Sequence, residues 1–292
     1  MNLGRVGVWS GSLQRRPTAH ALDLVGEWEE LGYGAVWVSE SPGGKNALTF
    51  SAVLLGGSTT IRLATGIANI WVRDPVAMMN ASRTLTDAFP GRFLLGVGVS
   101  HRSTAVLRGH DYRTPLSSTR AYLEAMNAAP YDGHPGSDPS TTVVAALGPK
   151  MVALAGELAD GIHPFLSTPD HTAGAREVLG PDKLIAVEQG VILTTDRDQA
   201  RAAARTNLER FLKWPNYRNH FRRLGFDEGE LVDGGSDRLV DALYAWGGED
   251  AIAARIAEHL AAGANHVCLQ GISGPLDEEV TLRELAPALL GG

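Results

Sequence analysis

The sequence contains a single cysteine, Cys268, among 292 residues, and this scarcity excludes two kinds of architecture. A disulfide framework within the chain needs at least two cysteines, and a thiolate-rich metal site needs several. Long apolar runs are also missing, because no stretch reaches the roughly 18 apolar residues of a membrane span. Residues 1–16 have no apolar core after a basic start, so no secretory signal is expected. The sequence therefore predicts a soluble, cytoplasmic protein.

An excess of positive charge is absent as well. The chain has 26 Lys and Arg against 33 Asp and Glu, which gives a formal net charge of −7. Domains that bind nucleic acid carry basic patches, and acidic lipid surfaces attract basic segments. We therefore expect neither nucleic acid nor a membrane as partner, and expect a small-molecule substrate instead.

Several motifs of enzyme chemistry are missing too. None of the nine histidines forms an HExxH or His-x-His pair, so no metal site is expected. No G-x-S-x-G sequence occurs, which disfavours an α/β-hydrolase. The sequence Gly96-Val97-Gly98 resembles part of a dinucleotide-binding fingerprint but lacks its third glycine. A Rossmann fold is therefore not expected.

Short β-rich apolar runs alternate with longer helical patterns along the whole chain. The predicted strands are Arg5–Ser10, Ala35–Ser39, Arg62–Ala68, Phe93–Val99, Thr142–Ala146, Gly161–His163, Leu184–Thr194 and His266–Leu269. The helices predicted between them include Ala19–Leu31, Ala47–Leu55, Pro75 to about Thr86, Thr114–Ala128, Lys150–Leu158, Pro169–Val178 and Ala251–Ala261. Such alternation indicates parallel strands joined by right-handed crossovers. Eight units favour an α/β fold of the (β/α)₈ TIM-barrel type over an open sheet.

A longer helical stretch follows the seventh predicted strand. It comprises Ala200–Leu212, Tyr217–Gly225 and Ser236–Ala245, which is more than one crossover needs. We interpret it as a helical insertion in a single domain that spans residues 1–292. The segments Arg102–Pro115 and Phe211–Gly235 are the loops expected to cover a pocket. Four aromatic residues could stack on a substrate there or belong to the core: Trp71, Trp214, Tyr217 and Phe221.

Active sites of such barrels lie at the C-terminal ends of the strands. Two titratable residues occupy such positions, Glu40 after the second strand and His101 after the fourth. From its position alone, Glu40 could be a base, a hydrogen-bond partner or a solvated loop charge. His101 faces the same alternatives, with Arg102 beside it as an anion contact.

Two glycine-containing segments also lie at strand ends. Gly66–Ile67 ends the third strand, where glycine marks either a close ligand approach or a packing position. Gly148, Pro149 and Lys150 join the fifth strand to a helix. This turn is either a phosphate site, built from backbone N–H groups and the helix dipole, or simply a tight connection.

Three segments together resemble one family: AVWVSE at 35–40, the stretch 63–101 from LATGIAN to FLLGVGVSH, and TTVVAALGPKMVALAGELADGIHP at 141–164. They are similar to the bacterial luciferase-like superfamily of flavin- and deazaflavin-dependent oxidoreductases. The actinobacterial type that uses coenzyme F420 is the nearest match. The similarity extends through 207–217 and 243–270, so it covers nearly the whole chain.

The resemblance implies a role for particular residues. A non-prolyl cis peptide at Gly66–Ile67 would support the central cofactor ring. Ser41 stands where relatives carry a histidine, which places proton transfer at that position in doubt. The ring and its side chain would be lined by Asn69, Val99, Ser100 and His101. The phosphate would bind Gly148, Pro149, Lys150 and Met151, with Ser167 and Thr168 as second contacts.

The implied function is hydride transfer between F420 and a small organic substrate, with Glu40 or His101 as proton donor. The alternatives are a monooxygenase that uses reduced FMN and O₂, and a barrel that binds a flavin without turnover. A homodimer is expected from the family.

Overall fold

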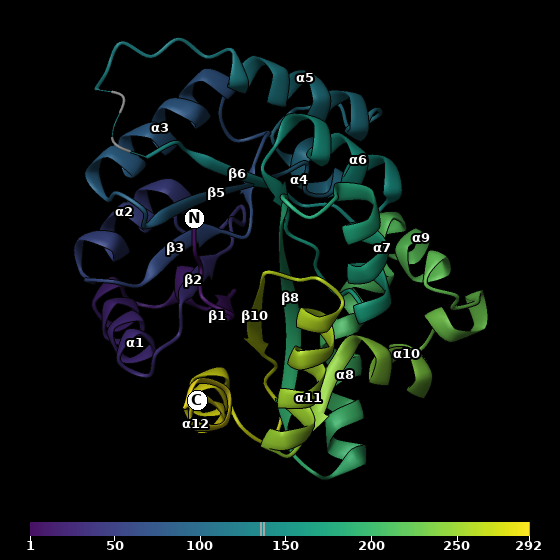
Figure 1. Cartoon of the computed structure of the whole chain (residues 1–292). Helices are drawn as coiled ribbons and strands as arrows, with labels where there is room; N and C mark the ends of the chain where they lie inside the picture. Colours follow the sequence, from purple (N-terminus) through teal and green to yellow (C-terminus); the bar gives the residue numbers. More distant parts are fainter. Residues whose placement is uncertain (135, 137, 292) are drawn as a thin grey trace.

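Parallel strands close into a barrel in the computed structural model, which describes residues 1–134, 136 and 138–291 (Figure 1). The strands of the ring are β1 (Val6–Ser10), β2 (Ala35–Val38), β3 (Arg62–Thr65), β5 (Phe93–Gly98), β6 (Thr141–Val144), β7 (Gly161–Ile162), β8 (Leu184–Leu193) and β10 (His266–Gly271). Neighbours pair in this order. The ring closes because β10 pairs with β8 on one side and β1 on the other. The predicted eight-stranded TIM barrel is confirmed.

Helices surround the barrel on its outer side (Figure 1). They are α1 (Thr18–Glu30), α2 (Ala47–Gly56), α3 (Pro75–Ala88), α4 (Arg102–Leu107), α5 (Pro115–Asn127), α6 (Pro149–Leu158), α7 (Pro169–Leu179), α11 (Glu249–Ala261) and α12 (Glu278–Leu290). Several begin at a residue whose side chain accepts a hydrogen bond from the first turn. Asp74 caps α3 in this way with Pro75 following it, a combination that fixes a helix start. None of the described helices is long and apolar enough to cross a membrane.

Large apolar side chains fill the barrel itself. Trp9, Trp37, Leu94, Val143 and Cys268 belong to one buried cluster inside the ring. Their alternation along each strand follows from the two-residue period of β-structure, which sends the intervening residues outward to the helices. The interior is therefore a packed core, and ligands are confined to the barrel ends.

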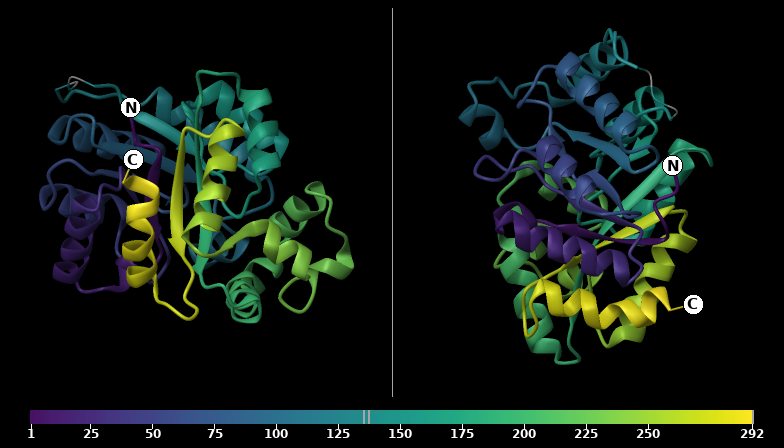
Figure 2. Two further views of the ribbon diagram at one scale, coloured as in Figure 1. Left: turned by 60° about the horizontal axis from the view of Figure 1, so that its bottom comes forward. Right: turned by 90° about the vertical axis from the view of Figure 1, so that its left-hand side faces the viewer.

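A helical region follows β8 and stands to one side of the barrel (Figure 2, left). It contains α8 (Arg197–Leu212), α9 (Pro215–Arg223), a short 3₁₀ helix, η2 (Glu228–Leu231), and α10 (Asp237–Leu243). A separate apolar cluster, which includes Leu208 and Phe221, holds this region together. The strand β9 (Tyr244–Gly247) then pairs in parallel with the end of β8.

The structure corrects three local predictions. Residues Tyr244–Gly247, whose first two were assigned to a helix, form β9, because the end of β8 offers a free edge there. The predicted loop after His101 begins with α4, and Phe211–Gly235 contains α9 and η2, so neither is an open loop. The helix α12, which no sequence pattern predicted, packs at the chain's end, with Tyr33 donating a hydrogen bond to the carbonyl of Leu282 at 2.7 Å.

The third predicted strand is also divided in two. β3 ends at Thr65, and the short strand β4 (Ala68–Asn69) pairs with β5 further along. The two residues between them, Gly66 and Ile67, are joined by a cis peptide bond.

Candidate active site

A cavity of about 670 Å³ opens at the C-terminal end of the barrel. Its walls come from the ends of β1, β2 and β10, from α8 and from the start of α12. The lining side chains used below are Trp9, Ser12, Ser41, Arg210, Gln270 and Glu278. This location agrees with the rule that barrel chemistry lies at the carboxyl ends of strands. We call this space the barrel-mouth cavity.

The cis peptide at Gly66–Ile67 lies at this end of the barrel, where the resemblance placed it. The indole N–H of Trp9 donates to the carbonyl of Gly66 at 3.0 Å. A Cβ atom on Gly66 would lie 2.5 Å from Trp9 Nε1 and 3.1 Å from His163 Nε2, so only glycine fits. The close packing of Trp9 and His163 therefore fixes this segment from the interior side.

Glu40 is surrounded by donors. Its Oε1 accepts from Arg73 at 2.6 Å and from the backbone N–H of Ala47 at 3.3 Å, and its Oε2 accepts from the backbone N–H of Asn69 at 2.8 Å and from Arg73 at 3.2 Å. The side chain is only 4% exposed and that of Arg73 is 12% exposed. The carboxylate thereby joins the end of β2, the start of α2 and β4. Both of its oxygens are occupied, and its part in proton transfer stays a prediction.

The neighbouring positions on this rim hold one another in place. Asn69 accepts from the backbone N–H of Trp71 at 2.9 Å, and the Trp71 indole donates to the carbonyl of Val99 at 2.8 Å. Asn69 Nδ2 is buried and has no partner among the described residues. Ser100 adopts a left-handed backbone conformation with φ of 54°. Asn69 thus keeps one free donor at the predicted ring site.

Ser41 lines the barrel-mouth cavity, but another side chain holds it. Its hydroxyl donates to Gln14 Oε1 at 3.0 Å.

His101 lies at the start of α4 and packs on an aromatic cluster from the helical region after β8. Its ring stacks on Trp214, with centroids 3.7 Å apart, and lies 5.9 Å from the ring of Tyr217. Burial lowers the pKa of His101 to about 4, against a smaller opposing effect of a hydrogen bond with Asn216. Nδ1 is buried and has no partner in the described structure. The imidazole is therefore neutral at pH 7 and keeps one unused nitrogen.

Trp71 and Trp214 therefore contact the predicted site residues, whereas Phe221 is fully buried in the apolar cluster of the helical region.

The predicted phosphate turn begins α6. Gly148 is the N-cap residue and provides no side-chain cap, and Pro149 occupies the first turn. The backbone N–H of Met151 bonds back to the carbonyl of Gly148 at 2.9 Å, while the side chain of Lys150 is exposed. A Cβ atom on Gly148 would lie 3.5 Å from the guanidinium of Arg223, which reaches the turn from α9. The turn therefore combines a helix N-terminus with a cation.

A second helix begins beside this turn. Thr168 caps α7 by accepting from the backbone N–H of His171 at 3.3 Å, and His171 contacts the carbonyl of Leu147 at 3.0 Å. The hydroxyl of Ser167 is buried without a partner among the described residues. A cavity of about 620 Å³ is lined by Pro149, Thr168 and Arg223, among others. The structure thus brings the six predicted phosphate contacts to the starts of two adjacent helices.

Four residues around the site were not predicted from the sequence. Arg73 lies in a short loop and Arg223 in a helix with several other charges, so no local signal marks them. Glu188 lies on β8, where burial raises its pKa to about 8, and its Oε1 has no partner in the described part of the chain. Glu278 comes from α12. Only Glu188 has a local sequence signal, because it is the single charged residue in the mostly apolar strand Leu184–Leu193.

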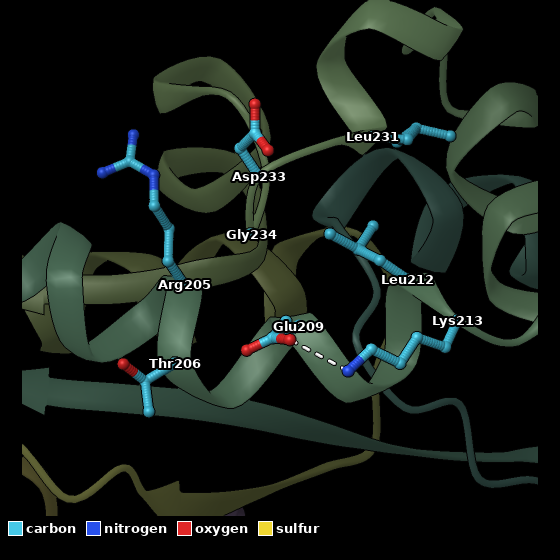
Figure 3. Close-up of a pocket in the computed structure, with 8 residues that line it drawn as sticks. All are labelled: Arg205, Thr206, Glu209, Leu212, Lys213, Leu231, Asp233 and Gly234. Carbon is cyan, nitrogen blue, oxygen red and sulfur yellow. Dashed lines mark hydrogen bonds and ion pairs between the residues drawn. The ribbon is translucent and has the colours of Figure 1, made fainter.

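A further hollow of about 460 Å³ lies between α8 and the segment around Gly234 (Figure 3). Lys213 donates to Glu209 across its floor at 2.9 Å. None of the predicted site residues lines it. Within the described residues, no group of three or more His, Cys, Asp or Glu side chains is placed to hold a metal ion.

Comparison with known proteins agrees with this fold. The profile of the family described as luciferase-like monooxygenase matches residues 2–266. A 5,10-methylenetetrahydromethanopterin reductase of Methanolobus tindarius is 23% identical, over 90% of this chain and 93% of that protein. A putative coenzyme F420-dependent oxidoreductase of Mycobacterium tuberculosis is 26% identical, over 89% of this chain and 86% of that one.

The fold is also that of a solved structure, the coenzyme F420-dependent tetrahydromethanopterin reductase of Methanopyrus kandleri. The two superpose with a TM-score of 0.79 at 18% identity, and the match covers 100% of this chain and 99% of the other. The family profile spans most of the sequence, from the first strand of the barrel to the start of the last. The chain belongs to the luciferase-like monooxygenase family.

Proposed function

We propose that this oxidoreductase transfers a hydride between coenzyme F420 and a small organic substrate at the barrel mouth. The proposal is supported by curated relatives that are named for F420 or for a reductase activity and that align over most of the chain. The observation that carries it is the anion site at the starts of α6 and α7. There the uncapped Gly148 lies beside the cation of Arg223, and Ser167, whose buried hydroxyl has no partner among the described residues, directly precedes the cap residue of α7.

The residues present fit a deazaflavin that carries a phosphate. Helix N-termini and arginine both favour a phosphate, and a buried hydroxyl without a protein partner is satisfied by a ligand atom or by water. At the ring end, the free Nδ2 of Asn69 is a second buried donor without a partner in the described structure. We propose that these two ends hold the ring at the cis peptide and the phosphate at Gly148–Met151, with Ser167 and Thr168.

The bound cofactor would supply or accept the hydride, and the protein would orient the reactants and handle the proton. His101 is the better placed of the two predicted proton-transfer residues, because its Nδ1 has no partner among the residues that the structure describes. As a neutral imidazole at pH 7 it can accept a proton from a substrate hydroxyl. We propose that Glu40 positions the rim through Arg73 and the backbone of Asn69 and Ala47.

A second candidate is an FMN-dependent monooxygenase. The description of the matching family favours it, and a phosphate site at Gly148 would serve FMN as well as F420. The proposal further includes a small-molecule substrate and a homodimeric assembly.

The test is a parallel titration of the purified protein with oxidised F420 and with FMN, followed by tryptophan fluorescence. Trp9 and Trp214 lie at the proposed ring site and are expected to report binding. Tight F420 binding with weak FMN binding supports the proposal. The reverse order favours the monooxygenase, and binding of neither contradicts both.

A variant pair locates the phosphate. Arg223→Gln removes the cation at the turn and is expected to weaken F420 binding roughly 10-fold or more, the value of a charge-assisted hydrogen bond. Arg222→Gln is the matched control, because Arg222 is paired with Glu228 and points elsewhere. Equal losses in the two variants would contradict the placement of the phosphate.

A further inference from the structure

A buried carboxyl group lines the barrel-mouth cavity and has no part in the proposed cofactor site. Glu278, the first residue of α12, is 8% exposed and contributes to the cavity wall. The hydroxyl of Ser12 donates to Glu278 Oε2, and Ser12 in turn lies 3.3 Å from the hydroxyl of Ser10. Ser12 lines the same cavity. A carboxyl and a hydroxyl thus face the space beside the proposed ring site.

The backbone around Glu278 packs closely against the end of β10. Gly271 ends β10, and a Cβ atom there would lie 2.9 Å from the Cα atom of Glu278. Asp277 caps α12 by accepting from the backbone N–H of Val280 at 2.9 Å, which fixes where the helix begins. Together these features press the first turn of α12 against the barrel end. The side chain at 278 is therefore held at the cavity by β10 and by its own helix cap.

Other polar groups of the cavity suit a substrate that carries oxygen or nitrogen. Gln270 is 8% exposed, lines the cavity and has a buried Oε1 without a partner among the described residues. Arg210 lines the opposite wall from α8, with its guanidinium 4.5 Å from the ring centroid of Phe211. A buried amide oxygen without a partner requires a donor from a ligand or from water. The cavity therefore offers a buried acceptor, a cation and a carboxyl to the same small molecule.

We propose that Glu278, together with Ser12, exchanges the proton with a carbonyl or imine substrate in the barrel-mouth cavity. This inference rests on the proposed function, which supplies the hydride. In the reducing direction the C=O or C=N carbon accepts the hydride from the reduced deazaflavin, which is thereby oxidised. The oxygen or nitrogen accepts the proton of the Glu278 carboxyl, directly or through the Ser12 hydroxyl. Solvent at the open cavity then returns a proton to the carboxylate.

The electrostatic surroundings of Glu278 are mixed. Burial is the largest effect and raises the pKa of Glu278, whereas hydrogen bonds from Ser12 and Ser10 oppose it. The charged and titratable groups that face it are Arg15 and Arg16, Glu279 and Asp277 of its own segment, His20 of α1 and Arg210 of α8. Arg16 is engaged by Glu279 at 2.5 Å. A raised pKa makes the protonated form of the carboxyl, which a general acid needs, more populated than in an exposed glutamate.

At pH 7 the imidazole of His101 is neutral and carries a single N–H, which makes it a far weaker acid than a carboxyl. Because the same group serves both directions of a reversible proton transfer, Glu278 takes the place of His101 in this inference. Glu278 supplies the acid that the reducing direction needs.

The test uses the full-length protein with Glu278→Gln, which keeps the shape of the side chain and removes the exchangeable proton. Glu279→Gln is the matched control, since Glu279 is the next residue and pairs with Arg16 outside the cavity. F420 affinity is measured first, for the wild type and both variants. We expect it to stay within about twofold of wild type. A wild type that does not bind F420 overturns the proposed function, whatever Glu278 does.

The second measurement is single-turnover oxidation of bound, reduced F420 by cyclohexanone, cyclohexenone and a cyclic imine (pyrroline). We expect E278Q to slow the reaction about 10²–10³-fold, the usual contribution of a general acid, and to abolish the loss of rate at high pH. Glu278→Asp is expected to restore part of the rate, and E279Q to match the wild type. Wild-type rates in E278Q overturn the inference. So does a wild type that binds F420 but reduces none of the three acceptors.

The third measurement needs no cofactor. Infrared difference spectra of wild type against E278Q are recorded across pH, in the carboxyl C=O stretching region. We expect a protonated carboxyl band that E278Q lacks and that persists to higher pH than an ordinary glutamic acid. Its absence overturns the inference even where F420 binds. A loss of F420 affinity in E278Q equal to the loss of rate does the same, because it assigns Glu278 a structural role.

Discussion

Replacing Glu40 with glutamine would separate a structural from a catalytic role at the rim. Glu40→Gln keeps the size of the side chain and removes its charge, which leaves the guanidinium of Arg73 facing a neutral amide. Because Arg73 is only 12% exposed, water cannot replace the lost partner. Removing one member of a buried ion pair costs about 3–5 kcal/mol. For a protein of this size the melting temperature should fall by on the order of 10 °C.

The assay is thermal unfolding of wild type, E40Q, Arg73→Met and the double variant, together with F420 affinity. R73M should cost less than E40Q, because Glu40 keeps the backbone N–H groups of Asn69 and Ala47. The double variant should be more stable than the sum of the two losses predicts, since it leaves no buried charge unpaired. The reasoning would be refuted by an E40Q protein that melts with the wild type and has lost only hydride transfer. That outcome would restore Glu40 as the proton-transfer residue.

The remaining predictions concern stability. Burial lowers the pKa of His163 from 6.5 to about 4, so between these values the unfolded chain binds a proton that the folded one does not. The stability that His163 contributes above pH 6.5 is therefore lost as the pH falls, and this group lowers the free energy of unfolding by about 2 kcal/mol between pH 7 and pH 5. In urea unfolding, the His163→Gln variant should show a difference between these two pH values that is smaller by this amount. A Cβ atom on Gly96 would lie 1.9 Å from the carbonyl oxygen of Thr65, so Gly96→Ala should destabilise by about 1–3 kcal/mol or more in the same assay. Gly26→Ala is its control: that site in α1 has no atom within 4 Å, and the change should stabilise by roughly 0.5–1 kcal/mol. An unchanged pH dependence in the first variant, or equal stabilities of the two alanine variants, would contradict the packing described for the barrel.

The sequence predicted those parts of the fold whose signals are local. Runs such as Phe93–Val99 are apolar throughout because the strands of a closed barrel are buried on both faces, and they appear in the structure within a residue or two. Tyr244–Gly247 was missed because a four-residue strand after a helix has no periodicity of its own. Its pairing with the end of β8 is a contact between segments 50 residues or more apart.

At the site, too, the features with local sequence signals could be predicted and the contacts between distant segments could not. The cis peptide and the glycine turn that begins α6 could be predicted, because each follows a strand end and resembles a family pattern. The partners could not. Arg73 pairs with Glu40, and Arg223 lies beside Gly148. Both contacts join segments far apart in the sequence, so only the tertiary structure brings them together. Glu278 was missed for a further reason, since no helix was predicted for α12, which contains Pro287.

The walls of the barrel-mouth cavity come from opposite ends of the polypeptide. Ser12 follows β1, whereas Gln270 and Glu278 lie in the last two elements of the chain. Protein synthesis proceeds from the N-terminus, so one wall exists early and the facing wall is made last. A nascent chain therefore lacks the complete cavity until translation is nearly finished, and a protein shortened by its final fifteen residues would lose the part of the wall that Glu278 and α12 provide. Binding in this cavity thus requires that β1 and α12, which are far apart in the sequence, have already packed together.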